Sequence, residues 1–232
     1  MLYFVSTPVG NLKDISLRAL EVLKSVDVIA CEDTLKLLNH YEIKKPLVAY
    51  HKFNETVAAE KIIRDLKDGK NVALITDAGT PVVSDPGNVL TKLLREEGVD
   101  YTVIPGATAF VPALILSGLD AQRFAFIGFL PGKKKDREEL LARYKNLDMT
   151  LIFYSAPHDL FDDLASLFDA FGARKAAVCK EITKLHEGVE RITLGDALAA
   201  QEPKGEYVIV VEGGEAEESE LLALSVEDHI KH

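Results

Sequence analysis

Short apolar runs alternate along this chain with stretches whose apolar positions recur every three or four residues. The runs are rich in β-branched residues and predict buried strands at residues 2–6, 27–30, 47–50, 72–75 and 102–104. The helically spaced stretches predict helices at residues 16–23, 35–41, 54–67, 88–97 and 107–116. In the first helix, Ser16 is the expected N-cap, and Leu17, Leu20 and Leu23 are expected on one face. This alternation predicts an α/β fold with mainly parallel sheets.

The same layout continues in the second half. Strands are expected at residues 124–127, 150–154, 176–180, 190–194 and 207–211. Helices are expected at residues 133–146 and 195–200, and a third follows residues 155–158 and ends near residue 171. The polar stretch 117–120 separates the halves. We therefore predict an N-terminal α/β domain at residues 1–117 and a C-terminal α/β domain at 118–214. An acidic linker and the start of a truncated helical module are expected at 215–232.

One loop stands out between the strand at 72–75 and the helix that follows it. Residues 76–87 read Thr-Asp-Ala-Gly-Thr-Pro-Val-Val-Ser-Asp-Pro-Gly, which is long for a connection between a strand and a helix. Asp85 is the expected N-cap of the helix, with Pro86 at its first position. Ligands of open α/β sheets bind at the carboxyl ends of the strands, so this loop predicts a binding site.

Composition narrows the class of protein. The 232 residues carry a net charge of −10, which argues against broad, non-specific nucleic-acid binding but allows a local basic patch. No apolar run approaches the roughly 20 residues of a membrane span, and the N-terminus lacks a basic leader, so a cytoplasmic protein without membrane attachment is expected. Cys31 and Cys179 are expected to be small buried residues.

Several standard signatures are absent from the sequence. It contains no Walker phosphate loop, no Gly-x-Gly-x-x-Gly after a strand, no Gly-x-Ser-x-Gly elbow and no His-Glu-x-x-His metal motif. The polar loops after the strands, near Pro8, Asp77, Pro105, Tyr154 and Glu181, can instead converge on one cleft. Such a cleft suits a medium-sized ligand held by backbone N–H and C=O groups.

A set of motifs carries a resemblance to a known family. In chain order they are Ser-Thr-Pro-Val-Gly-Asn-Leu, Glu-Asp-Thr, the twelve residues 76–87, Ile-Pro-Gly-Ala-Thr-Ala, Gly-Phe-Leu-Pro, Tyr-Ser-Ala-Pro-His and Lys-Gly-Glu-Tyr. Together they cover residues 2–213 and resemble the tetrapyrrole methylase superfamily, and within it the ribosomal RNA small-subunit methyltransferase I family. The resemblance implies methylation of a cytidine ribose 2′-OH in 16S ribosomal RNA by S-adenosylmethionine. It also implies two α/β domains with the cofactor in the cleft between them, commonly as a homodimer.

The resemblance assigns site residues to this sequence. Pro8 would lie under the cofactor, and Ser155 and Thr183 would contact its adenosine side from the second domain. The remaining expected cofactor contacts are Asp77, Ala78, Gly79, Thr80, Val83, Thr108 and Ala109. Gly79 would let the backbone approach the ligand, while Asp77 can also orient the loop through backbone hydrogen bonds.

Methyl transfer to a ribose hydroxyl is helped by a general base, because this hydroxyl is a poor nucleophile. Glu32, Asp33 and Asp85 are the candidate catalytic residues, and His51, His158 and His186 remain alternatives. The competing role for Asp85 is helix capping, and the competing interpretation of Glu32 and Asp33 is a solvated loop.

Contact with RNA is expected at the basic cluster of Lys133, Lys134, Lys135 and Arg137. These cations begin a helix, where they oppose its dipole, so a binding role is favoured over a solvated helix start. Two departures from the family pattern concern RNA binding. About three residues are missing after Thr34, where the family has an Arg-containing insert, and the chain ends inside the expected helical module.

Two other functions remain open from the sequence. The first is a methylase of a tetrapyrrole carbon, whose loop is of a Gly-Asp-Pro type where this chain has Gly79-Thr80-Pro81. The second is a non-catalytic cofactor-binding or RNA-binding protein of the same fold.

Overall fold

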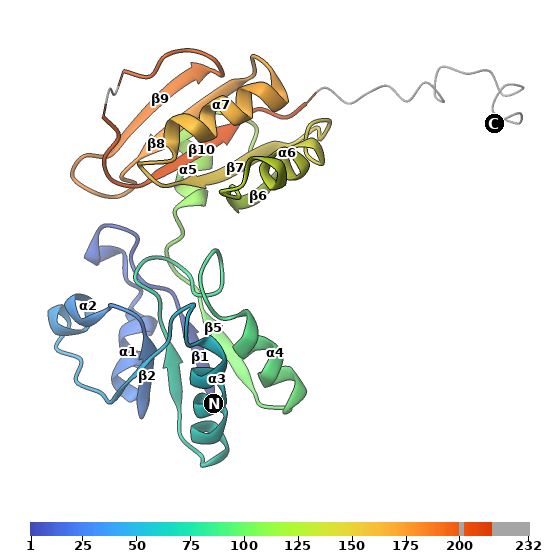
Figure 1. Ribbon diagram of the computed structural model, residues 1–232. Coiled ribbons are helices and arrows are strands. Elements are labelled where there is room, and N and C mark those ends of the chain that lie inside the picture. The colour runs from blue at the N-terminus through green and yellow to red at the C-terminus, as the bar shows by residue number, and fades with distance from the viewer. Residues whose placement is uncertain (200–201, 215–232) are drawn as a thin grey trace, which may run out of the picture. The chain divides into compact units, whose positions relative to one another are not determined.

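The computed structural model describes residues 1–199 and 202–214 (Figure 1). It divides into two compact units. The first unit comprises Met1–Pro112 together with Glu181–Glu187, and the second comprises Ala113–Lys180 with the described residues from Gly188 onward. The predicted linker and helical module at 215–232 lie outside the described residues.

The first unit is built on a five-stranded parallel sheet in the order β3-β2-β4-β1-β5. Its strands are β1 (Leu2–Val5), β2 (Val28–Cys31), β3 (Leu47–Ala49), β4 (Val72–Leu74) and β5 (Tyr101–Ile104). Its helices are η1 (Leu12–Asp14), α1 (Leu17–Ser25), α2 (Leu35–His40), α3 (Glu55–Lys67) and α4 (Asn88–Glu96). The α/β class expected from the alternating pattern is confirmed.

Helices cover both faces of this sheet (Figure 1). On one face, Phe4 and Leu74 pack with Ile62 of α3 and Leu94 of α4. On the other face, the buried residues of α1 and α2 pack against side chains such as Ile29, Ala73 and Ile104. Alternate residues of each strand therefore enter different cores, which explains the continuous apolar runs of the sequence.

The second unit has a mixed sheet in the order β6-β7-β10-β8-β9. Its strands are β6 (Phe124–Phe129), β7 (Thr150–Ser155), β8 (Lys175–Lys180), β9 (Gly188–Thr193) and β10 (Tyr207–Val211). Only β6 and β7 pair in parallel, so the parallel arrangement holds for the first sheet but not for most of the second. Helices α6 (Lys134–Ala142) and α7 (Leu160–Phe171) pack on one face of this sheet around Phe153, while α5 (Phe110–Ser117) spans the division between the units.

In α1, Ala19 and Leu23 are buried and Leu17 is 79% exposed. Two local expectations are wrong. No helix forms at the described residues 195–199, where Asp196 instead closes a turn by accepting the Thr193 N–H at 2.8 Å. Asp85 does not cap α4: Gly87 holds that position with φ of 146°, and Pro86 lies before the helix.

The cap of α4 comes from a distant carboxylate. Glu55 Oε1, in the first turn of α3, accepts the N–H groups of Gly87 at 2.7 Å and Val89 at 3.1 Å. The same oxygen accepts the Tyr50 hydroxyl at 3.1 Å. A negative charge at a helix N-terminus is favourable, so Glu55 fixes the point where the loop at 76–87 enters α4.

A segment from late in the chain belongs to the first unit. Within Glu181–Glu187, Thr183 Oγ1 accepts the Asn11 N–H at 3.0 Å. A Cβ on Gly10 would lie 2.4 Å from Lys184 Cγ and 2.8 Å from the Ile182 carbonyl oxygen. Only glycine leaves room for this segment beside the loop that follows β1.

Within the described residues, no helix has both the length and the apolar character that crossing a membrane requires.

Replacing Glu55 by Ala should lower the free energy of unfolding by about 1–3 kcal/mol, because two N–H groups of α4 and the Tyr50 hydroxyl lose their acceptor. Urea denaturation measures this change. Glu60→Ala, at an exposed position of the same helix, is the matched control and should change stability by less than about 0.5 kcal/mol. Equal effects of the two substitutions would contradict the capping role of Glu55.

Replacing Gly10 by Ala should displace Glu181–Glu187 and destabilise the chain by about 1–3 kcal/mol, as overpacking does. Faster amide hydrogen exchange at residues 181–187 is the expected observation. Gly132→Ala is the control, because a Cβ there meets no atom within 4 Å. Unchanged exchange in the Gly10 variant would show that the segment does not depend on this close approach.

Candidate functional site

The loops that follow β1 and β4 are joined by a pair of backbone hydrogen bonds. The Thr7 N–H donates to the Gly79 carbonyl at 2.8 Å, and the Gly79 N–H donates to the Thr7 carbonyl at 3.1 Å. The Thr7 hydroxyl adds a bond to the Thr76 carbonyl at 2.9 Å. The connections from β1 to β2 and from β4 to β5 leave in opposite directions, so this is the topological switch point at which open α/β sheets bind ligands.

The loop after β5 joins the same cluster. The Ser6 and Thr80 hydroxyls lie 2.9 Å apart, and the Thr80 hydroxyl donates to the Ala107 carbonyl at 3.3 Å. A Cβ on Gly106 would lie only 2.8 Å from Ser6 Cβ, so glycine is needed for this approach. Three loops that are distant in sequence therefore form one connected edge.

Small residues line this edge. Gly79 has φ of 85°, and a Cβ there would meet Val9 Cγ1 at 3.5 Å and the Ala107 oxygen at 3.8 Å. Pro8 is buried beneath the bridge, and Thr108 and Ala109 directly precede α5. The first N–H groups of a helix have no partner within it and favour an anionic group. Gly79 is buried and both of its backbone polar groups are bonded to Thr7. Thr108 and Ala109 are partly exposed, so a polar ligand can reach this edge at the start of α5.

The second part of the loop at 76–87 is held in strained backbone. Val82 and Ser84 have φ of 76° and 63°, values that are uncommon for residues with a side chain. A Cβ on Gly87 would lie 2.5 Å from Val82 Cγ2, so the chain closes tightly before α4. Val83 is consequently presented at the surface.

Carboxylates gather at the same edge. Burial raises the pKa of Asp85 to about 6, a hydrogen bond from Thr76 opposes this, and the charges of Asp77 and Glu32 add to it. Asp77 Oδ1 accepts the Asp33 N–H at 2.9 Å, which ties the loop after β2 to the loop after β4. The structure therefore brings Glu32, Asp33, Asp77 and Asp85 together. The Asp77 carboxylate joins two loops, whereas the sequence predicts a bond to the backbone of its own loop.

The two cysteines are buried, as expected. Burial raises the pKa of the Cys31 thiol, which lies at the end of β2 beside this group of acids. A thiol whose pKa is raised is a weak nucleophile, so Cys31 fits a packing role.

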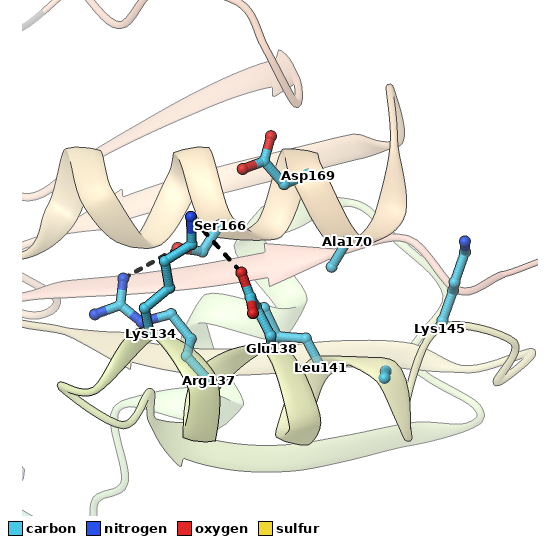
Figure 2. Close-up of a pocket in the computed structure, with 9 residues that line it drawn as sticks. Lys134, Arg137, Glu138, Leu141, Lys145, Ser166, Asp169 and Ala170 are labelled. Atoms are coloured by element: carbon cyan, nitrogen blue, oxygen red, sulfur yellow. Dashed lines mark hydrogen bonds and ion pairs between the residues drawn. The ribbon is translucent and has the colours of Figure 1, made fainter.

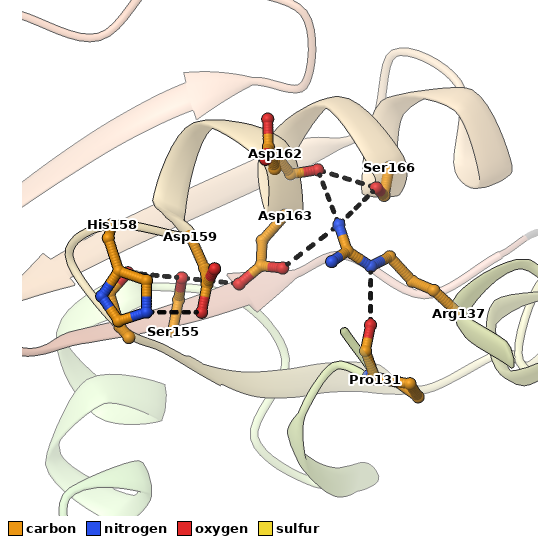
Figure 3. Close-up of polar contacts among 9 residues, drawn as sticks. Pro131, Arg137, Ser155, His158, Asp159, Asp162, Asp163 and Ser166 are labelled. Atoms are coloured by element: carbon orange, nitrogen blue, oxygen red, sulfur yellow. Dashed lines mark hydrogen bonds and ion pairs between the residues drawn. The ribbon is translucent and has the colours of Figure 1, made fainter. Parts of the chain in front are cut away.

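The expected cofactor residues are distributed over both units. Thr183 belongs to the first unit, where it contacts Asn11 of the loop that follows β1. Ser155 belongs to the second unit and is buried, and its hydroxyl donates to Asp163 Oδ2 at 2.7 Å (Figure 3). The Ser155 side chain is therefore engaged by α7.

Arg137 completes this network of polar contacts (Figure 3). Its side chain is only 13% exposed and lies 3.6 Å from Asp163 Oδ1. It also donates to the Pro131 carbonyl at 3.0 Å and to the Ser166 hydroxyl at 3.0 Å. Burial raises the pKa of Asp163, while the Ser155 bond and the Arg137 charge act against this. Arg137 is thus largely used within the fold.

The lysines of the basic cluster are placed differently. Lys134 and Lys135 lie on the exposed side of α6, each 3.7 Å from a glutamate one turn later, and Lys133 precedes the helix. A cavity of about 300 Å³ opens between α6 and α7, bordered by Lys134 and Lys145 but also by Glu138 and Asp169 (Figure 2). Because cationic and anionic side chains both border this cavity, its charge favours neither an anionic nor a cationic ligand.

The alternative histidine bases belong to three different segments. His51 accepts the Phe53 N–H through Nδ1 at 3.3 Å, and His158 lies 3.3 Å from Asp159 in the second unit. His186 is exposed in Glu181–Glu187. Neither of the two histidine contacts involves the carboxylates around Asp85.

The structural roles of Thr7, Glu55 and Asp163 are not evident from the sequence. The position of Arg137 could have been anticipated, because it lies one helical turn before Leu141, which is buried. The contacts of Glu55 and Asp163 join elements distant in sequence, and no local pattern signals them.

Comparison with known proteins identifies the family. A sequence profile of the tetrapyrrole (corrin/porphyrin) methylases matches residues 1–198. The ribosomal RNA small subunit methyltransferase I of Halalkalibacterium halodurans is 45% identical, over 100% of this chain and 83% of that protein. The protein of the same name from Bacillus subtilis is 42% identical over the same shares.

A solved structure of diphthine synthase has a TM-score of 0.72 at 18% identity, covering 91% of this chain and 89% of that chain, and shows the shared fold. The family profile extends over most of the chain, and the identity to named relatives exceeds 40% along its whole length. The chain therefore belongs to the tetrapyrrole methylase family, within its ribosomal RNA small subunit methyltransferase I group.

Proposed function

We propose that this protein is an S-adenosylmethionine-dependent methyltransferase that modifies the ribose 2′-OH of a cytidine in 16S ribosomal RNA. The observation that carries the proposal is the edge formed by the loops after β1, β4 and β5, with Asp85 beside it. Relatives 41–45% identical that are named as ribosomal RNA methyltransferases support the RNA substrate. This protein would act in the cytoplasm, where that substrate resides.

The residues of the edge fit the cofactor. Ala78, Thr80 and Val83 provide a partly exposed surface for its methionine and ribose portions, in loops whose Pro8 and Gly79 are buried. Thr108 and Ala109 offer N–H groups to its carboxylate. Ser155 and Thr183 are assigned to its adenosine side. When bound, S-adenosylmethionine supplies an activated methyl group, so positioning the acceptor is a large part of catalysis.

Asp85 is the base that we favour over Glu32 and Asp33. A general base works best when its pKa is near the working pH, and the Asp85 pKa of about 6 is close to neutral. The competing role as a helix cap is filled by Glu55, so the Asp85 carboxylate, which has a hydrogen bond from Thr76, is not needed at the start of α4. The negative charges of Asp77 and Glu32 help Asp85 to hold a proton.

The basic cluster is assigned to phosphate contacts. Lys133, Lys134 and Lys135 lie at the exposed start of α6, and Lys134 and Lys135 can exchange their glutamate partners for RNA phosphates. Arg137 supports this segment by bonding the Pro131 carbonyl just before it.

We also propose a homodimer, supported by exposed apolar side chains of the second unit, such as Ile115, Phe124 and Phe129.

Methyl incorporation from labelled S-adenosylmethionine tests the proposal. Small-subunit ribosomal RNA, free or assembled into the subunit, should accept the label at a ribose 2′-OH. Label in a tetrapyrrole instead would support the carbon methylase alternative. Binding of cofactor or RNA without incorporation into any acceptor would support the non-catalytic alternative.

Replacing Asp85 by Asn should lower methyl transfer by about 10²–10⁴-fold, the usual contribution of a general base. In the unchanged protein, activity should rise with pH through about 6 as Asp85 ionises. A variant with unchanged activity would exclude Asp85 as the base.

The same substitution should stabilise the fold at higher pH. Asp85 binds its proton more tightly in the folded chain than in the unfolded chain, so its ionisation lowers stability as pH rises from about 4 to about 6. Removing the charge should raise the unfolding free energy at pH 8 by about 1 kcal/mol, after allowance for solvent screening, and change it little at pH 3. Thermal denaturation at both pH values measures this difference.

A further inference from the structure

Phe53 is an aromatic side chain presented to solvent. It is 84% exposed, whereas the other exposed phenylalanines of the described chain are 41–55% exposed: Phe124, Phe129, Phe161 and Phe168. Val57, one turn later in α3, is also exposed. Two apolar side chains at the start of α3 are therefore open to a binding partner.

The turn that carries Phe53 is well ordered by hydrogen bonds. The His51 N–H donates to Asn54 Oδ1 at 2.9 Å, and Asn54 Nδ2 donates to the Ala49 carbonyl at 3.0 Å. The Phe53 N–H donates to His51 Nδ1 at 3.3 Å. The backbone therefore holds the ring outward, and little ordering is required when a ligand binds.

The surroundings of the ring favour an anionic, aromatic ligand. Lys52 Nζ lies 4.9 Å from the centre of the Phe53 ring. Residues 43–54 contain three lysines and no acidic residue, in a chain whose net charge is −10. The next acid, Glu55, directs its carboxylate to Gly87 and Val89 in the fold. A nucleotide combines the two properties that this surface matches, a flat base and a phosphate.

The position of the turn relates it to the proposed site of methyl transfer. It follows the carboxyl end of β3, which pairs with β2, and β2 pairs with β4. Two strand spacings of about 4.8 Å place the ends of β3 and β4 about 10 Å apart. The turn that carries Phe53 therefore follows the same edge of the sheet as the loop that carries Gly79 and Asp85.

We propose that Phe53 stacks on an unpaired base of the RNA substrate, beside the nucleotide whose ribose is methylated, and that Lys52 contacts the adjoining phosphate. Sequence-specific RNA recognition commonly uses splayed bases stacked on aromatic side chains. This inference rests on the proposed function and adds a substrate contact within the first unit.

The absence of tryptophan from the chain allows a direct test. Phe53→Trp places a single tryptophan at the site, and base stacking should quench its emission as small-subunit ribosomal RNA is added. Phe161→Trp, at an exposed phenylalanine of α7, is the matched control and should be quenched less. Equal quenching at both positions would overturn the proposal.

A second substitution separates stacking from apolar contact. Phe53→Leu should raise the apparent KM for RNA by about 5-fold to 100-fold, the range expected for loss of one stacked base, while Phe53→Trp should retain the lower value. Affinity for S-adenosylmethionine and thermal stability should not change. An unchanged KM for RNA in the leucine variant would overturn the proposal.

Two further outcomes separate the stacking role from a protein contact and from the proposed function. Emission of the Phe53→Trp variant that depends on protein concentration without RNA would assign the surface to contact between copies of the chain and overturn the stacking role. Normal RNA methylation by this variant without quenching would defeat the stacking inference alone. Failure of any ribosomal RNA to bind or accept a methyl group would defeat the proposed function, and the stacking inference with it.

Discussion

The paired backbone hydrogen bonds between Thr7 and Gly79 are the constraint on which the proposed site depends. They hold the loop after β1 against the loop after β4 at the switch point of the sheet. Ser6 and Thr80 then extend the cluster to the loop after β5. Because backbone groups make the first contact, it depends on local conformation rather than on particular side chains. Gly79, with its positive φ, makes that conformation favourable.

Fixing these loops has an electrostatic consequence. Four carboxylates from the loops after β2 and β4 are brought together, and burial raises the pKa of one of them, Asp85, to about 6. A negative group is also needed at the start of α4, and Glu55 supplies it from α3. The fold thus divides two roles between two acids, helix capping for Glu55 and, in our proposal, proton transfer for Asp85.

Features that depend on neighbouring residues can be predicted from this sequence, and features that depend on residues far apart in the chain cannot. The strands and helices of the first unit depend on local apolar spacing, and the pattern places them within a few residues. Asp85 as a cap is a sound local expectation, but a contact from Glu55, thirty residues earlier, prevails. The antiparallel pairing of β10 with β7 and β8 likewise depends on partners distant in sequence. So does the ion pair between Arg137 and Asp163.

The charge of the chain bears on how it could recognise RNA. A protein with net charge −10, and with carboxylates beside its proposed reaction site, gains little from general attraction to phosphates. Recognition must then come from local features, and exposed lysines at the start of α6 and the Lys52–Phe53 turn are two such features. Stacking is insensitive to net charge, so an aromatic contact is a suitable partner for a few lysines. The acidic surface would disfavour arbitrary RNA, and a splayed base in the correct place would provide the selectivity that charge cannot.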